Sequence, residues 1–374
     1  MLFNVCALYI KIMNNENQTI HKSDDNLTIY GWNEKLNQLK QESIYSALAH
    51  GRVSIVHRTC YEVISGNGLF QCELTGNMMY GKSDDELPCT GDWVIFQPFD
   101  EHKGIIVDSL PRERTLYRKK SGTVADKQAI ASYVDKAFIV QSLDDNFNVR
   151  RVERFMVQIM EENISSVLVL NKADLDFDRQ SVEEQIKHIS SQIPVFFTSI
   201  HQLETIVRLR KSISEGETVV FVGSSGVGKS SLVNALCEKP VLLTSDISLS
   251  TGKGRHTSTR REMVLMDSSG VLIDTPGVRE FGLAIDNPDS LAEVLEISDY
   301  AELCRFKDCK HINEPGCAVI EAVNSGALDS KVYESYLKLR REAWHFSASE
   351  HEKRKKEKSF TKLVEEVKNR KANR

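Results

Sequence analysis

The chain lacks any apolar run of the ~18–20 residues that a membrane-spanning helix needs. It also lacks a strong charge of either sign, because its net charge of −5 is small for 374 residues. This excludes a protein that is basic throughout and binds polyanions by bulk charge. Hydrophobic residues make up 41% of the chain and charged residues 27%, as in ordinary globular proteins. We therefore expect a cytoplasmic protein with two or three folded domains and no membrane partner.

Cysteine is scarce as well. Eight cysteines are too few for a disulfide scaffold and favour a reducing compartment with one metal site. The candidate ligands lie within fourteen residues and are Cys304, Cys309, His311 and Cys317. Three thiolates and one imidazole form a closed tetrahedral zinc site with no position for a reacting water, so we predict a structural ion. An iron–sulfur cluster is a weaker alternative because histidine ligands are uncommon there. Buried free cysteines beside an unrelated histidine are the simplest alternative.

The chain divides into four stretches. Residues 1–45 are polar and rich in asparagine, and predict a weakly ordered lead-in. Residues 46–114 hold short β-rich runs between glycine-bearing turns, which indicates a small β-barrel. This pattern alone favours an oligonucleotide-binding barrel and an SH3-like barrel without a nucleic-acid role about equally. Residues 115–286 alternate buried strands with helices, as in a parallel α/β domain, and residues 287–374 read as mostly helical.

A phosphate-binding loop begins after the apolar run 219–222, and a helical pattern follows it. The sequence Gly-x-x-x-x-Gly-Lys-Ser in this context predicts a P-loop, whose glycines let successive N–H groups face the phosphates. Lys229 would reach the β- and γ-phosphates, and the Ser230 hydroxyl would ligate Mg²⁺. The predicted nucleotide-binding residues of the loop are Gly223, Ser224, Ser225, Gly226, Val227, Gly228, Lys229, Ser230 and Ser231.

A second phosphate-side element is Asp274-Thr275-Pro276-Gly277, which follows the apolar run 271–273. Alone, Asp-x-x-Gly is also a common turn, but downstream of a P-loop it is a strong signal. The Asp274 carboxylate can hold Mg²⁺ through a water, and the Gly277 N–H can sense the γ-phosphate. We therefore predict catalytic roles for Lys229, Ser230, Asp274 and Gly277.

The base-reading box is Asn171-Lys172-Ala173-Asp174, at the end of the apolar run 167–170. The Asp174 carboxylate can accept the N1–H and 2-amino hydrogens of guanine, which adenine does not present. The stem of Lys172 would pack along the base, and the N–H of Ser199 is predicted to reach the guanine oxygen. Ile200 follows Ser199 where GTPases usually carry alanine, which weakens this last contact.

The base box precedes the P-loop, whereas ordinary GTPases have the reverse order. A ligand site depends on where its groups lie in space, so the chain can be cut and rejoined at surface loops without losing the site. The inverted order therefore predicts a circularly permuted GTPase domain that binds GTP and GDP with Mg²⁺.

These motifs together resemble the circularly permuted ribosome small subunit-dependent GTPases, a bacterial ribosome-biogenesis family. The resemblance covers about residues 50–325 and includes Leu110–Arg114, Gly254–Thr259 and Val278–Gly282. It implies a multi-domain protein with an oligonucleotide-binding (OB-fold) barrel, a permuted GTPase domain and a mostly helical zinc-binding domain. It also implies GTP hydrolysis that the small ribosomal subunit stimulates late in its maturation. The expected partners are that subunit and its rRNA, and the chain is expected to be a monomer.

The residue that activates water is not the usual one. Many GTPases carry glutamine after Asp-x-x-Gly, but here Val278 occupies that position and cannot polarise water. His256, in the Gly- and Ser-rich segment Ser248–Arg260, is the candidate, and the family resemblance favours the same residue. Composition alone equally allows a surface histidine. Thr257 or Thr259 is expected to complete the coordination of Mg²⁺.

The C-terminal tail contains the basic run Lys353–Lys358. The resemblance favours contact with rRNA phosphates, whereas composition alone favours a solvated helix face. We predict a GTPase whose nucleotide state controls its docking on the small subunit and its release. One alternative is an RNA-binding assembly scaffold with a largely inactive nucleotide site. Another is a GTPase switch for a different partner, such as a membrane complex.

Overall fold

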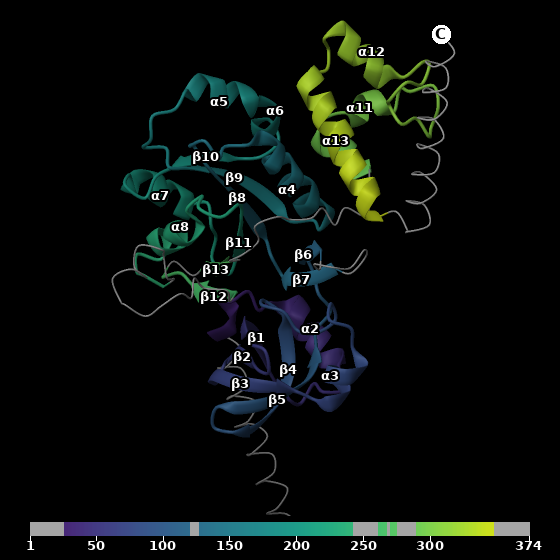
Figure 1. Cartoon of the computed structure of the whole chain (residues 1–374). Coiled ribbons are helices and arrows are strands. Elements are labelled where there is room, and N and C mark those ends of the chain that lie inside the picture. The colour runs from purple at the N-terminus through teal and green to yellow at the C-terminus, as the bar shows by residue number, and fades with distance from the viewer. Residues whose placement is uncertain (1–25, 120–126, 242–260, 268–269, 275–288, 348–374) are drawn as a thin grey trace, which may run out of the picture.

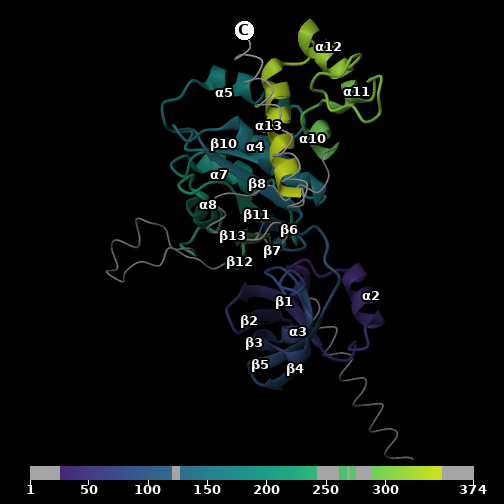
Figure 2. The ribbon, with the colours of Figure 1, turned by 45° about the vertical axis from the view of Figure 1, so that its right-hand side comes forward.

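The computed structural model describes residues 26–119, 127–241, 261–267, 270–274 and 289–347. Figure 1 shows three units in a row, with a β-barrel at the bottom, an α/β domain in the centre and a group of helices above it. The rotated view of Figure 2 keeps this order. None of the helices in the described ranges combines the length and apolar character of a membrane-spanning segment.

The N-terminal unit is a closed five-stranded barrel. Its strands are β1 (Ala49–Val56), β2 (Tyr61–Ser65), β3 (Gly68–Leu74), β4 (Trp93–Asp100) and β5 (Lys103–Ser109). They pair in the order β1-β2-β3-β5-β4, β4 pairs back onto β1, and β3 and β5 run parallel. Helix α3 (Gly76–Gly81) connects β3 to β4. A five-stranded Greek-key barrel is the OB-fold, so the structure confirms this prediction over the SH3-like alternative.

The predicted weakly ordered lead-in is wrong for residues 26–45. Helix α2 (Glu34–Glu42) is capped by Asn33, whose side chain accepts a hydrogen bond from the Leu36 N–H at 3.1 Å. Leu27, Trp32 and Leu36 are buried against the barrel. The Trp32 ring lies 4.9 Å from the Trp93 ring in an edge-on contact. A few apolar side chains in a polar stretch are enough to anchor it. Residues 1–25 lie outside the described residues.

The central unit is a mostly parallel sheet covered by helices on both faces. Its strands are β8 (Lys136–Ser142), β9 (Ser165–Asn171), β10 (Val195–Thr198), β11 (Thr218–Val222), β12 (Glu262–Leu265) and β13 (Val271–Asp274). Their order is β10-β9-β8-β11-β13-β12, with only β12 antiparallel. The five residues of β11 are all buried, which explains why its last four residues form an unbroken apolar run.

Two hydrophobic cores cover the two faces of this sheet. Helices α4 (Val149–Glu161), α5 (Arg179–Gln185) and α6 (Lys187–Ser190) pack on one face. Helices α7 (Leu203–Arg210) and α8 (Lys229–Leu236) pack on the other. An additional antiparallel hairpin, β6 (Leu116–Lys119) and β7 (Lys127–Ala131), follows the barrel and was not predicted from the sequence.

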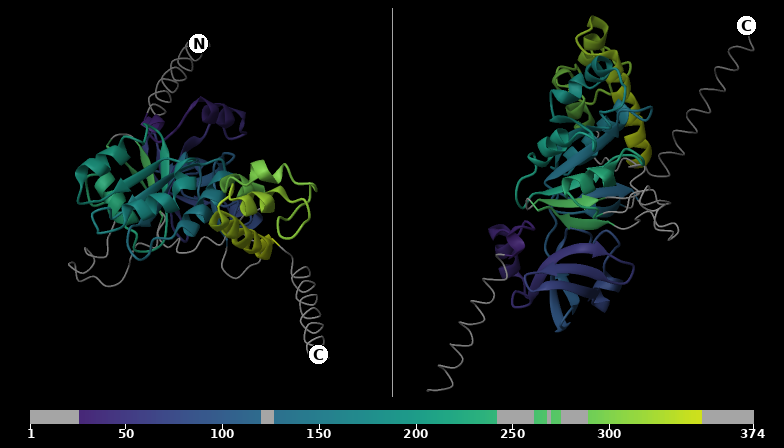
Figure 3. Two further views of the ribbon diagram at one scale, coloured as in Figure 1. Left: turned by 90° about the horizontal axis from the view of Figure 1, so that it is seen from above. Right: turned by 90° about the vertical axis from the view of Figure 1, so that its left-hand side faces the viewer.

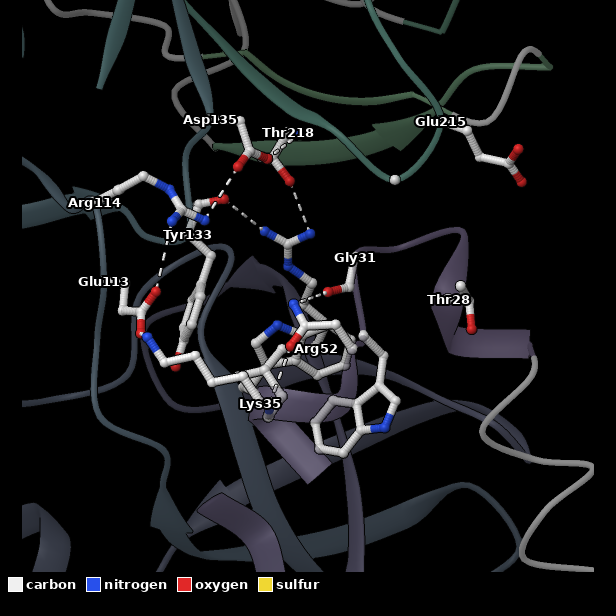
Figure 4. A pocket seen from close by; sticks show the side chains of 15 residues that line it. Thr28, Gly31, Lys35, Arg52, Glu113, Arg114, Tyr133, Asp135, Glu215 and Thr218 are labelled. Atoms are coloured by element: carbon white, nitrogen blue, oxygen red, sulfur yellow. Dashed lines mark hydrogen bonds and ion pairs between the residues drawn. The ribbon is translucent and has the colours of Figure 1, made fainter. Parts of the chain in front are cut away.

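A buried arginine joins the barrel to the central sheet (Figure 4). Arg52, on β1, donates hydrogen bonds to the Gly91 carbonyl at 3.0 Å, to the Thr218 hydroxyl at 2.9 Å and to the Tyr133 carbonyl at 3.3 Å. It also donates to the carbonyl of Tyr30. Burial lowers the pKa of Arg52 to about 10, so it remains charged at neutral pH. Thr218 begins β11, so the strand that leads to the P-loop is tied directly to the barrel.

The C-terminal unit contains helices α10 (Asp289–Val294), α11 (Ser298–Ala301), α12 (Ala318–Ser325) and α13 (Ser330–Ser347). The right-hand view of Figure 3 places these helices at the end of the central domain opposite to the barrel. Helices α13 and α4 are linked by the Arg154–Glu342 ion pair at 2.9 Å. The nearly fully buried Glu153 accepts from the Ser335 hydroxyl and lies 2.9 Å from His188 Nε2. The mostly helical prediction for this region is confirmed for the described residues 289–347.

Candidate guanine nucleotide and metal sites

The P-loop joins β11 to α8 in a conformation that requires glycine. Gly223, Gly226 and Gly228 have φ values of 151°, 82° and 93°. A side chain at Gly223 would lie 2.3 Å from the Val140 carbonyl. Lys229 Nζ spans the loop and donates to the carbonyls of Gly223 at 2.8 Å and Ser224 at 2.9 Å. Burial lowers the pKa of Lys229, and the negative charge of Asp274 opposes this shift. The loop thus has the compact shape of an anion-binding P-loop.

The two described residues that are predicted to hold Mg²⁺, Ser230 directly and Asp274 through a water, lie together. Ser230 lies in the first turn of α8, and Asp274 lies at the end of β13, the strand next to β11. The Ser230 hydroxyl donates to Asp274 Oδ2 at 3.2 Å. A hydroxyl and a carboxylate are hard oxygen donors, so this pair fits a magnesium site. The remaining predicted residues of the phosphate side, Gly277, His256, Thr257 and Thr259, lie outside the described residues.

The base box directly contacts the P-loop. Asn171 Nδ2 donates to the Val227 carbonyl at 2.8 Å, and Asn171 Oδ1 accepts from the Thr198 hydroxyl at 3.3 Å. A side chain at Gly228 would come within 2.3 Å of the Asn171 amide. The structure therefore brings together two motifs that stand more than fifty positions apart in the chain.

The charged residues of the base box are oriented by their neighbours. Lys172 has a φ of +62° and forms an ion pair with Asp144 at 2.8 Å. Partial desolvation raises the pKa of Asp144, but hydrogen bonds from Lys172, Ser142 and the Asn146 N–H outweigh it and give a pKa of about 2. Asp174 is exposed, and a hydrogen bond from Ser199 lowers its pKa. An exposed, ionised carboxylate fits the predicted recognition of guanine.

The predicted role of the Ser199 backbone requires a correction. Its N–H does not point to an open site but donates to the Thr205 hydroxyl at 3.1 Å. That bond depends on α7, six residues further along, which the motif itself does not include. The Ser199 side chain instead accepts from the His201 N–H at 3.0 Å and hydrogen-bonds Asp174.

The structure also adds residues that the motifs did not include. Between β8 and α4, Asn146 Nδ2 lies 3.3 Å from the Ser224 hydroxyl of the P-loop. Arg151 Nη1 donates to the same hydroxyl at 2.9 Å. The available signal was the polar segment Asp144–Asn148 immediately after a buried parallel strand, since the carboxyl ends of such strands meet at one edge of the sheet.

The four predicted zinc ligands converge in the C-terminal unit. The ligand atoms of Cys304, Cys309, His311 and Cys317 all lie within 4.8 Å of one another. Cys304 and Cys317 have their sulfurs 3.8 Å apart, and His311 Nδ1 lies 3.5 Å and 3.4 Å from them. A tetrahedral ion with Zn–S bonds of about 2.3 Å separates two sulfurs by about 3.8 Å. The donor set and its spacing therefore fit zinc.

Local structure fixes this cluster. His311 has a φ of +54°, and the Tyr333 hydroxyl on α13 donates to its carbonyl at 2.6 Å. Gly316, with a φ of +75°, turns the chain so that Cys317 immediately precedes α12. The site thus connects the loop to two helices, as expected for a structural ion.

Comparison with known proteins gives two matching family models. The RsgA GTPase model matches residues 109–284. An ABC transporter model matches residues 206–369, a range that includes the P-loop, which ABC proteins also carry.

Two relatives match almost the whole chain. The small ribosomal subunit biogenesis GTPase RsgA 1 of Bacteroides thetaiotaomicron is 76% identical over 361 residues, covering 96% of this chain and 100% of that protein. The small ribosomal subunit biogenesis GTPase RsgA of Methanosarcina acetivorans is 38% identical over 338 residues, covering 87% and 89%.

Two solved structures share the fold. The crystal structure of YjeQ from Thermotoga maritima has a TM-score of 0.61 and 26% identity, over 79% of this chain and 98% of that one. YloQ, described as a circularly permuted GTPase, has a TM-score of 0.59 and 21% identity, over 82% and 99%, and supports the fold alone. With the high identity to a relative along nearly its full length, this chain belongs to the RsgA family of GTPases.

Proposed function

We propose that this chain binds GTP, hydrolyses it to GDP and phosphate, and acts in the biogenesis of the small ribosomal subunit. The observation that carries the proposal is the 2.8 Å hydrogen bond from Asn171 to the Val227 carbonyl. This bond supports the proposal that the guanine-reading box and the phosphate loop form one site despite their inverted order. The names of the relatives supply the cellular process.

Within this site, each residue has a proposed role. Lys229 binds the β- and γ-phosphates, Ser230 and Asp274 hold Mg²⁺, and the Gly277 N–H responds to the γ-phosphate. Magnesium supplies positive charge that neutralises the phosphate oxygens. Asp174 accepts the two guanine hydrogens. Because the Ser199 N–H already donates to Thr205, we assign the guanine oxygen to the next N–H, that of Ile200.

The water-activating role stays with His256, and Thr257 or Thr259 completes the Mg²⁺ shell. In a His256→Ala chain we expect GTP binding to persist and subunit-stimulated turnover to fall by roughly 100-fold or more. Single-turnover assays with radiolabelled GTP measure this. Unchanged stimulated turnover with intact binding would remove His256 from the mechanism.

The other units supply the docking surfaces. We assign the OB-fold barrel to residues 46–114, the GTPase domain to 115–286 and the zinc-binding helical domain to 287–374. The barrel, the zinc-binding domain and the basic tail are proposed to contact rRNA in the cytoplasm, with the chain acting as a monomer. GTP favours the docked state, and hydrolysis breaks the γ-phosphate contacts and lowers affinity for the subunit.

Turnover of GTP and of ATP, with and without purified small subunits and at several salt concentrations, tests this function. We expect hydrolysis of GTP only, stimulation by the subunit, and weaker stimulation as salt rises, because binding through phosphates releases counterions. Equal rates with and without subunits would refute the proposed partner. Binding to subunits without any turnover would instead favour the assembly-scaffold alternative.

A further inference from the structure

Three arginines near the start of α4 have different partners. Arg150 lies 3.7 Å from Glu334, and Arg154 lies 2.9 Å from Glu342, so α13 provides a carboxylate for each. Arg151 donates instead to the Ser224 hydroxyl at 2.9 Å and to the side-chain and backbone oxygens of Asn146 at 3.0 and 3.3 Å. All three are neutral acceptors. Among the residues that the structure describes, the charge of Arg151 therefore has no acidic partner.

The charge of Arg151 lies next to the P-loop. Arg151 is half-buried and touches the second residue of the P-loop, an element whose N–H groups bind anions. Within the described ranges, its three hydrogen bonds all come from Nη1, which leaves Nε and Nη2 of the planar fork for another acceptor. A guanidinium binds phosphate oxygens more strongly than it binds a hydroxyl, because both partners are charged.

We infer that Arg151 is a further phosphate-contacting residue of the nucleotide site, and that it binds the terminal phosphate of GTP. It exchanges the Ser224 hydroxyl for a phosphate oxygen, while Asn146 keeps the guanidinium close to the loop. This inference rests on the proposed function, since it concerns the same triphosphate. Its consequence is specific: Arg151 contributes to the affinity for GTP and little to the affinity for GDP, which lacks the γ-phosphate.

A purely bracing role makes a different prediction. If Arg151 only held the P-loop through Ser224, its loss would loosen the loop for every nucleotide. Affinities for GDP and GTP would then fall together, because both occupy the same N–H groups. The ratio of the two affinities therefore separates ligand contact from support of the loop.

The experiment uses the full chain with fluorescent GDP and a fluorescent non-hydrolysable GTP analogue. For Arg151→Gln we expect analogue binding to weaken by roughly 10–100-fold, from the loss of charged hydrogen bonds, with GDP binding retained. Arg151→Lys keeps the charge but not the fork, so it should recover part of the loss. Arg150→Gln is the matched control on the same helix, and we expect it to leave both affinities unchanged.

Two results would overturn the inference: equal weakening of GDP and analogue, or no weakening of either. Circular dichroism checks the fold of each variant. If Arg151→Gln is unfolded, Arg151→Lys replaces it, and an unchanged ratio of GDP to GTP-analogue affinity in that variant overturns the inference. The proposed function is judged separately on the wild-type chain. If the wild-type chain binds neither nucleotide, the proposed function fails and the inference fails with it. If the wild type hydrolyses GTP normally but Arg151→Gln leaves the ratio of GDP to GTP-analogue affinity unchanged, only the inference fails.

Discussion

Replacing Asn171 by alanine tests the contact that unites the two halves of the nucleotide site. Asn171 is only 3% exposed. Its amide makes two hydrogen bonds, to the carbonyl of Val227 at 2.8 Å and from the hydroxyl of Thr198 at 3.3 Å. Both partner residues, Val227 and Thr198, are fully buried. Alanine thus removes the bonding partner of an acceptor and of a donor that are shielded from water.

The expected cost follows from these two bonds. A buried polar group left without its partner costs about 1–3 kcal/mol. The Thr198 bond is long and lies at the lower end of that range, so we expect a total loss of roughly 2–4 kcal/mol in the free energy of unfolding. Because Val227 belongs to the P-loop, the same change should weaken GDP binding, although Asn171 belongs to the base box.

Urea unfolding followed by circular dichroism measures the stability, and titration with fluorescent GDP measures the binding. Asn324→Ala is the control, because Asn324 is exposed on α12 and should change stability by no more than about 0.5 kcal/mol. The reasoning fails if Asn171→Ala unfolds at the same urea concentration as the wild type. It also fails if stability falls while GDP binding is unaffected, since the amide would then support the core and not the P-loop.

Three further predictions concern other parts of the molecule. Arg52→Met should lower the free energy of unfolding by at least about 3 kcal/mol, since it removes several buried charged hydrogen bonds; an unchanged urea midpoint would contradict this. Cys309→Ser should reduce zinc content, measured by plasma mass spectrometry, and speed proteolysis of the C-terminal helices; full zinc retention would exclude the site. The depressed pKa of Asp144, about 2 against 3.8, implies stability that is present above pH 4 and lost as pH falls toward 2. In Asp144→Asn, the free energy of unfolding should lose this part of its dependence on pH between about pH 2 and 6. The same pH dependence in the variant and the wild type would refute the prediction.

The residues with the clearest sequence signals were those whose chemistry is local. The P-loop needs its glycines and Lys229 within one turn, and the zinc ligands need only a short loop, so both are readable from spacing. The buried strands of the central sheet can be predicted from the sequence too. Helices cover both faces of the sheet, so all five residues of β11 are buried and its last four are apolar. The type of barrel was not readable from pattern, because it depends on which strands pair, such as β3 with β5.

The features that sequence reasoning missed depend on contacts between distant segments. Trp32 anchors the lead-in only because Trp93 offers a surface sixty-one positions later. The backbone of Ser199 is redirected by Thr205. Arg151 looks like one of several basic residues on an amphipathic helix until the fold places it against Ser224. In each case the residue type is ordinary, and its role comes from a partner that no local motif contains.

The position of β11 gives the nucleotide site direct structural contacts toward both outer units. This strand has five residues, about 17 Å of extended chain, with Thr218 at its start and the P-loop after its end. Arg52 holds the start of the strand to the barrel. Beside the end of the strand, Arg151 on α4 donates to Ser224 of the P-loop. Arg154 on the same helix forms an ion pair with Glu342 on α13. Because both connections are direct side-chain contacts between described residues, we expect a change at the phosphates to have a short physical route to each outer unit. Arg52→Met should therefore weaken GDP binding as well as stability, and normal GDP affinity in that variant would show that the barrel end of the route carries no coupling.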